Sequence, residues 1–183
     1  MGLTSGMKRS CLVIYCALLG LSGVMIGCNY QLEGTNPQLP SGAATIAIIP
    51  IQNRTFQSGL ETRLMRHLRQ LLRNNSSVHL SSLQEADLIL DIQLQSLDTK
   101  QTSVSADGAT VALQLALQGS VTLNHRKNRQ LLWREKELNA RGVLLYEKGE
   151  TSKGLTGSTI GRGLDEVTSA FAKRIYERIF FRF

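Results

Sequence analysis

The sequence is poor in the residue patterns from which catalytic and metal sites are built. Its three histidines, His67, His79 and His125, have no cysteine or acidic residue at metal-ligand spacing around them. The stretch 161–163, Gly-Arg-Gly, has too few glycines for a phosphate-binding loop and lacks the lysine of such a loop. No serine lies in a nucleophile-elbow sequence. We therefore expect no enzymatic activity, no bound metal and no cofactor.

Cysteine is equally scarce, and the cysteines present lie near the N-terminus. Cys11 and Cys16 fall in an apolar run, residues 11–26, that follows two basic residues, as in an export signal. The run is shorter than the roughly 20 apolar residues of a membrane span. We predict that residues 1–27 form a removable signal peptide. The mature chain would then have no thiol pair, so its stability must come from packing rather than from disulfides.

The end of the apolar run, Met25-Ile26-Gly27-Cys28, resembles the lipobox of bacterial lipoproteins. The resemblance implies cleavage before Cys28 and acylation of its thiol and amine, and each buried methylene of the acyl chains stabilises attachment by about 0.8 kcal/mol. Asn29 follows instead of the aspartate that retains lipoproteins at the inner membrane, which implies the outer membrane, periplasmic side. The alternatives are a signal cut elsewhere or an uncleaved anchor.

Residues 28–44 contain several glycines, prolines and polar residues but no apolar period, which predicts a lipidated tether. At about 3.3 Å per residue it could span at most roughly 55 Å. Residues 45–183 then form one domain with its own core. The formal net charge of +7 falls by two when Lys8 and Arg9 leave with the signal. A modest basic excess is compatible with an anionic surface, and we expect no nucleic acid partner.

Within this domain, two apolar stripes at helical spacing predict helices. One begins near Ser58, where Ser58-Gly59-Leu60-Glu61 fits a capping box. The other begins near Leu164, after a Gly-rich and Ser-rich segment, residues 148–163, which we predict to be a mobile loop. The stripes comprise Leu60, Leu64, Leu68, Leu71 and Leu72, and then Leu164, Val167, Phe171, Ile175 and Ile179.

Four further segments have the composition or alternation of strands: residues 46–50, 86–97, 111–123 and 130–140. Asp107-Gly108 and the basic segment 124–129 separate the last three, which predicts two hairpins with residues 111–123 as the central strand. We expect an α+β fold: a mostly antiparallel four-stranded sheet with two helices packed on one face. The opposite face is polar and free to meet water or a partner.

The order of several short motifs is similar to that of the LptE-like lipopolysaccharide-assembly lipoproteins. The resemblance implies a lipoprotein that partners and plugs a large LptD-like outer-membrane β-barrel for assembly of lipopolysaccharide. A strand followed by Asn-Arg-Thr also occurs in envelope lipoproteins that activate cell-wall synthases or build secretion channels, which is the alternative. The matching motifs are Cys28, Tyr30, Leu32, Gly34, Leu39-Pro40, Ile46 to Pro50, Asn53-Arg54-Thr55 and Gly59-Leu60-Glu61.

The family resemblance also implies that basic side chains near the hairpin tips meet lipopolysaccharide phosphates. The turn at 106–108 carries no basic residue. Any such contact would fall on the other hairpin or on residues after it. The candidates are Arg126, Lys127, Arg129, Lys148 and Lys153. The plainer interpretation of the 124–129 cluster is a solvated turn that discourages edge pairing.

Overall fold

The computed structural model describes residues 39–104, 110–147 and 157–181. It confirms an α+β fold, with two helices and one mixed sheet of six strands. A short 3-10 turn, η2 (Pro40–Gly42), precedes the first strand. The elements are β1 (Thr45–Ile48), β2 (Gln52–Asn53), α2 (Leu60–Arg73), β3 (His79–Leu80), β4 (Leu88–Val104), β5 (Thr110–His125), β6 (Leu131–Glu147) and α3 (Gly157–Phe181).

The N-terminal strands differ from the prediction, because β1 is parallel to both of its neighbours, β3 and β4. The helix α2 lies between β1 and β3 in the chain, and such a crossover helix returns the chain to the sheet in its original direction. The predicted four-stranded, mostly antiparallel sheet is therefore wrong in strand number and in the pairing of this half. Beyond Pro50, which cannot donate to a ladder, the chain rejoins β4 as β2, again in parallel.

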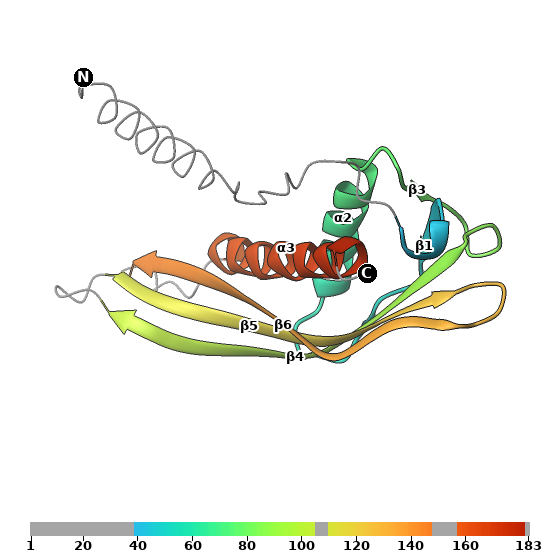
Figure 1. Ribbon diagram of the computed structural model, residues 1–183. Helices are drawn as coiled ribbons and strands as arrows, with labels where there is room; N and C mark the ends of the chain where they lie inside the picture. The colour runs from blue at the N-terminus through green and yellow to red at the C-terminus, as the bar shows by residue number, and fades with distance from the viewer. Residues whose placement is uncertain (1–38, 105–109, 148–156, 182–183) are drawn as a thin grey trace, which may run out of the picture. The chain divides into compact units, whose positions relative to one another are not determined.

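The C-terminal strands form the predicted antiparallel meander, with strand order β3-β1-β4-β5-β6. They are longer than the sequence pattern indicated and run together as a curved ribbon (Figure 1). The strand that joins the two halves of the sheet is β4, which pairs with β1, β2 and β5, so β5 is not the central strand. The predicted turn at 106–108 lies outside the described residues.

Both helices cover the same face of the sheet (Figure 1). The α2 stripe is buried at every fourth position from Leu60 to Leu72, whereas Leu71 is only partly buried. Every predicted apolar position of α3 is buried, from Leu164 to Ile179. These stripes pack against the inward side chains of β4, β5 and β6 in one hydrophobic core. Burial of this apolar surface holds the two helices on the sheet.

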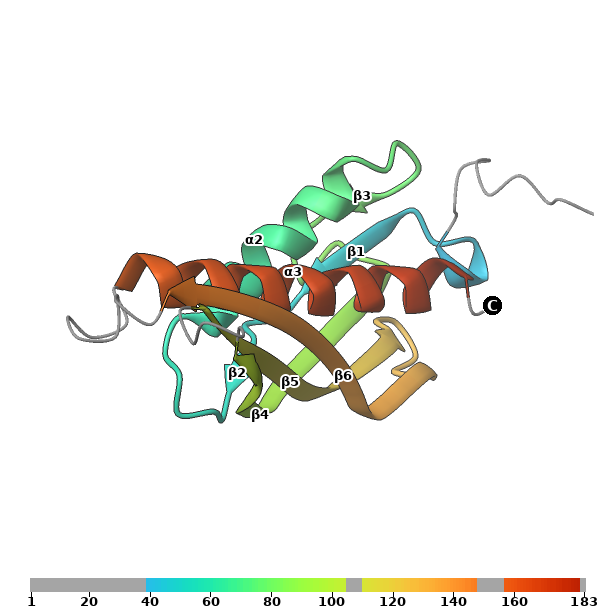
Figure 2. The same cartoon turned by 90° about the vertical axis from the view of Figure 1, so that its left-hand side faces the viewer.

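The closeness of α3 to the sheet depends on glycine at two sheet positions. A Cβ at Gly142 of β6 would lie 3.1 Å from the backbone nitrogen of Val167. A Cβ at Gly119 of β5 would lie 2.6 Å from the backbone oxygen of Gln93 and 3.0 Å from the Phe171 ring. Figure 2 shows α3 lying along β6. The helix starts at Gly157, so the predicted loop is wrong for residues 157–163, while residues 148–156 lie outside the described part.

Candidate functional site

The turn between β5 and β6 contains three of the predicted phosphate contacts, and the structure gives them different surroundings. The backbone amide of Arg126 donates to the Asp87 carbonyl at 2.8 Å, and its Nε donates to the Ala86 carbonyl at 2.7 Å. Lys127 and Arg129 are exposed, and Arg129 has a left-handed backbone with φ of 54°. Arg126 therefore joins the turn to the start of β4, and the other two cations face solvent.

Lys148 and Lys153 lie outside the described residues. The pairing of β5 with β6 fixes the two ends of the hairpin. At one end Asn124 of β5 pairs with Leu131 of β6, next to the 126–129 turn, and at the other end Thr110 pairs with Glu147. Lys148 directly follows Glu147 in the sequence. Among the described residues, Arg126, Lys127 and Arg129 therefore lie together in one turn.

The loop between β2 and α2 is organised by Asn53, the first residue of the Asn-Arg-Thr motif. Its Nδ2 donates to Glu61 Oε2 at 2.7 Å and to the Gln57 carbonyl at 2.8 Å. Its Oδ1 accepts from the Thr55 amide at 3.0 Å and from Thr55 Oγ1 at 2.7 Å. One side chain thus bonds to both ends of the loop, as Asn side chains do when they replace backbone bonds in turns.

The same loop corrects the predicted helix start. Gly59, not Ser58, is the N-cap, with a φ of 84° that favours glycine, and no side chain caps the helix there. The Glu61 half of the capping box is present, since its Oε1 accepts the Gly59 amide at 3.3 Å. A backbone hydrogen bond at Glu61 lowers the pKa of its carboxyl, as do bonds from Asn53 and Gly59, against the opposing effect of burial.

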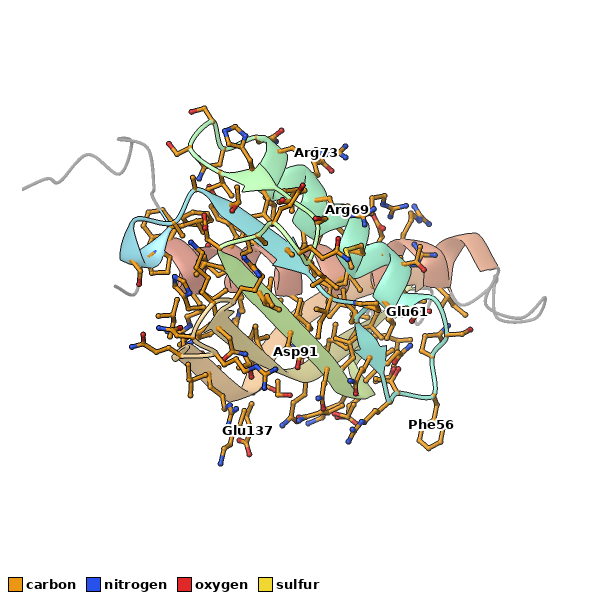
Figure 3. All side chains as sticks on the ribbon, turned by 90° about the vertical axis from the view of Figure 1, so that its right-hand side faces the viewer. Phe56, Glu61, Arg69, Arg73, Asp91 and Glu137 are labelled. Atoms are coloured by element: carbon orange, nitrogen blue, oxygen red, sulfur yellow. The ribbon has the colours of Figure 1, made fainter. Side chains whose placement is uncertain are left out.

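Two side chains of this ordered loop point into solvent. Arg54 is exposed, and only its backbone amide is fixed, by a 2.9 Å bond to the Leu94 carbonyl. Phe56 has a relative exposure of 111%. Figure 3 shows its ring projecting away from the body of the domain. Sequence reasoning missed Phe56, although an aromatic residue within a polar turn is an available signal.

The outer side of α2 carries a second feature that sequence reasoning left unassigned. Arg69 and Arg73 are exposed, and no described residue pairs with either (Figure 3). They line a groove of about 670 Å³ that also includes apolar side chains of Pro50, Ile51 and Met65. The two arginines also line a smaller groove of about 320 Å³ beside Ile48 and Leu80. We call Arg69, Arg73 and the three apolar residues of the larger groove the α2 surface.

The other side of α2 is joined to α3 through Asp165. Its Oδ1 accepts from Arg63 at 3.4 Å, from His67 Nε2 at 3.2 Å, and from Arg66. Burial raises the pKa of Asp165. The hydrogen bond and charge of His67 and the charges of Arg66 and Arg63 together lower this pKa by more than burial raises it, so the pKa lies below its usual value. These four charged or titratable side chains therefore serve to join α2 to α3.

The face of the sheet away from the helices is polar. Between the buried positions of β4 and β5, the outward side chains include Asp91, Gln93, Ser120 and Thr122. Asp91 pairs across the ladder with Thr122, and Gln93 with Ser120. Because both strands are long and neither described helix covers this side, it forms a broad, largely polar surface, which we call the outer sheet face (Figure 1).

The entry of the chain into the domain is fixed by Asp87. Its Oδ2 accepts from Thr45 Oγ1 at 2.8 Å and from the amides of Ala44 and Thr45, each at 3.3 Å. The Thr45 hydroxyl in turn accepts the Asp87 amide at 2.9 Å. The bond from the Thr45 side chain is the main cause of a lowered Asp87 pKa, with smaller contributions from the Ala44 and Thr45 amides and from Lys127, against burial. The first strand is thus held beside β4 by polar contacts as well as by pairing.

The described part of the chain contains neither a metal-ligand cluster nor a membrane-spanning helix. No group of three or more histidine, cysteine, aspartate or glutamate side chains there could hold a metal ion. No described helix combines the length and apolar character needed to cross a membrane.

Comparison with family models matches residues 43–180 to the lipopolysaccharide-assembly family LptE. The match spans every strand and helix from β1 to α3. This chain belongs to the LptE family. The membership confirms the resemblance drawn from the sequence motifs and makes the protein a lipoprotein-type component of lipopolysaccharide assembly. The match begins after Cys28, so the lipidation site stays a prediction.

Solved structures resemble this LptE-family chain at the level of the fold. Protein CT253 from Chlamydia trachomatis is 10% identical, with a TM-score of 0.46, covering 75% of this chain and 98% of that one. A minor lipoprotein from Acinetobacter baumannii is 12% identical, with a TM-score of 0.44 and coverage of 75% and 90%. A neuraminyllactose-binding hemagglutinin homolog from Helicobacter pylori is 11% identical, with a TM-score of 0.48 and coverage of 84% and 93%. Comparison with curated protein sequences gives no significant match.

Proposed function

We propose that this protein is an outer-membrane lipoprotein, acylated at Cys28 and facing the periplasm, that partners and plugs an LptD-like β-barrel during assembly of lipopolysaccharide. The observation that carries the proposal is the family match over residues 43–180. The protein would act by binding and by filling space, without catalysis. The part of the predicted tether that precedes the buried Leu39 would leave the domain free to enter the barrel while its acyl chains stay in the inner leaflet of the outer membrane.

The outer sheet face is the surface that suits the barrel wall. The interior of a large outer-membrane barrel is polar, whereas its outer surface is apolar. The outer sheet face offers polar and charged side chains from three long strands, including Asp91 on β4, Ser120 on β5 and Arg134 on β6. Contact through this face would leave the helices and their core undisturbed.

Co-purification tests this partner. The lipidated protein should co-purify with the abundant lipopolysaccharide-assembly barrel and not with a penicillin-binding protein, which is the partner class of the alternative function. Ser120→Trp would place a bulky ring on the outer sheet face and should reduce recovery of the barrel. Ser169→Trp, at an exposed position of α3, is the matched control and should not. Recovery of a cell-wall synthase instead of the barrel would overturn the proposal.

We further propose that Lys127 and Arg129 contact phosphates of lipopolysaccharide, together with Lys148 and Lys153, and that Arg126 supports them from within the turn. Near an anionic surface a basic residue contributes about 1 kcal/mol. Lys127→Glu with Arg129→Glu should therefore weaken lipopolysaccharide binding by more than about tenfold at low salt, without changing the melting temperature. Arg126→Glu should also lower the melting temperature, because it removes the bond to Ala86. Unchanged affinity in the folded double variant would assign this cluster to a solvated turn.

The lipid anchor has its own test. Cys28→Ala should abolish acyl labelling and fractionation with the outer membrane. The variant should retain the melting temperature of the domain, because the buried side chains described in the structure begin at Leu39. Acyl label retained in the purified variant would contradict the predicted lipobox.

A further inference from the structure

We propose that the α2 surface and the loop that carries Phe56 form a docking site for anionic phospholipid, which the protein uses on the bilayer before it joins its barrel. This inference rests on the lipid anchor of the proposed function, which would hold the domain within reach of a membrane. It concerns a different surface from the outer sheet face and the β5–β6 turn.

The first observation is the conformation of Phe56. A phenylalanine exposed to this degree contributes no packing to the domain, yet the loop that presents it is fixed by the bonds of Asn53 to Thr55, Gln57 and Glu61. The ring is thus held away from the protein in a defined position, and little entropy would be lost when it is bound. Phenylalanine in this position fits an apolar environment outside the domain.

The second observation is the charge along α2, the helix that follows this loop. Figure 3 shows Arg73, Arg69 and Glu61 in succession along α2, with Phe56 on the loop before the helix. Glu61 is engaged with Asn53 and Gly59, whereas Arg69 and Arg73 have no partner among the described residues. Two free guanidinium groups beside an apolar groove match phosphate groups that lie above an apolar layer.

A bilayer fits these features better than an acidic protein does. Protein interfaces usually surround an aromatic anchor with a continuous apolar patch. Here the other large exposed apolar side chains of the described residues lie on other segments of the chain, namely Leu83, Leu131, Val143 and Phe181. A single aromatic side chain with nearby cations is sufficient at a membrane interface, where aromatic rings insert at headgroup depth and basic residues meet anionic lipids. Tethering raises the local lipid concentration, so a weak contact suffices.

The test uses the acylated full-length mature protein, reconstituted into vesicles that contain neither barrel nor lipopolysaccharide. Phe56→Trp provides a fluorescent probe, and the native Trp133 is buried in the core and gives a constant background. In vesicles of phosphatidylglycerol and phosphatidylcholine, nitroxide-labelled lipid should quench the new tryptophan. Glu137→Trp, at an exposed position of β6, is the matched control and should not be quenched (Figure 3).

The arginines are tested in the same background. Each basic residue contributes about fivefold to association with an anionic surface, so Arg69→Glu with Arg73→Glu should weaken docking by at least about 25-fold. Quenching should then fall to the level of the Glu137→Trp control. It should also fall as salt rises from about 0.1 M to about 1 M, where the screening length shortens from about 10 Å to about 3 Å. Both arginines are exposed, so the melting temperature should not change.

Several results would overturn the inference. One is a tryptophan at position 56 that stays accessible to a water-soluble quencher and is not reached by the lipid label. Equal quenching in pure phosphatidylcholine, or in the double arginine variant, would exclude recognition of anionic lipid. Protection of position 56 only after addition of the barrel would assign the surface to a protein partner. Mass spectrometry of the same sample reports acylation of Cys28 directly, which distinguishes a missing anchor from a failure to dock.

Discussion

The two faces of the same sheet are built for different purposes. On the face beneath the helices, Leu90, Ile92 and Leu117 are completely buried. On the outer sheet face, many of the intervening positions are polar and partly exposed, as at Asp91 and Ser120. Side chains of a strand alternate between faces, so one run of sequence specifies both. The comparison indicates that stability resides on the helix side, and that the outer sheet face can change without loss of the fold.

The strongest test of this difference places the same charge on each face of β5. Leu115→Arg would bury an unpaired charge and should cost about 3 to 5 kcal/mol of a total stability of about 5 to 15 kcal/mol. Gln114→Arg, next to it on the outer face and partly exposed, should change stability by less than about 0.5 kcal/mol. Urea unfolding measures both. Equal losses would mean that the outer face is also part of the core.

A smaller change tests how tightly the helix side is packed. Gly119→Ala adds one methyl group 2.6 Å from the Gln93 carbonyl oxygen, a backbone atom that cannot move aside freely, and should cost about 1 to 3 kcal/mol. Ser120→Ala, one residue along on the outer face, is the control and should be nearly neutral. A neutral Gly119→Ala variant would show that β4 and β5 can separate there at little cost.

The polar network of the β2–α2 loop should contribute less to stability than the burial of Leu115 or the close packing at Gly119. Asn53→Ala removes four hydrogen bonds from a partly buried position and should cost about 1 to 2 kcal/mol. Asn128→Ala, in the exposed β5–β6 turn, removes two bonds, both with Gln130, and should cost less than about 0.5 kcal/mol because the site is exposed. Thermal unfolding compares them. Similar effects at the two positions would mean that the loop holding Phe56 is no better ordered than an ordinary turn.

The smallest expected effect is the pH dependence from Asp165. Its pKa in the folded protein lies below the usual value, so its contribution is complete above the unfolded pKa of about 3.9 and is lost as the pH falls through the folded pKa. The side chain is 41% exposed, so the contribution should stay below about 1 kcal/mol. Asp165→Asn should remove that part of the acid-side decline in stability.

Periodicity in the sequence was sufficient to predict the helix side of the domain. The stripes from Leu60 to Leu72 and from Leu164 to Ile179, and the alternation along β4 and β5, each give a local rule for which side chains are buried. Parallel pairing of β1 with β3 and β4 has no comparable local signal, because the partners are distant in the chain. The same limit applies to the site: Arg126 resembled Lys127 and Arg129 until its contact with Ala86 was known.

The pairing of β1 with β4 also bears on the order in which the chain folds. Ile46 and Leu88 pair although α2 and β3 separate them in the sequence, so their pairing must close a long loop. In contrast, β4, β5 and β6 pair through successive hairpins. Contacts close in sequence form sooner than those that must first close a long loop. We therefore expect the meander to form first and β1 to join it last. In pulsed hydrogen exchange during refolding, the Ile49 amide, which donates to Leu90, should gain protection after the β4–β5 amides. The strand nearest in sequence to the proposed lipid anchor would then be the last part of the domain to become native, and the unpaired edge of β4 would be exposed for the longest time.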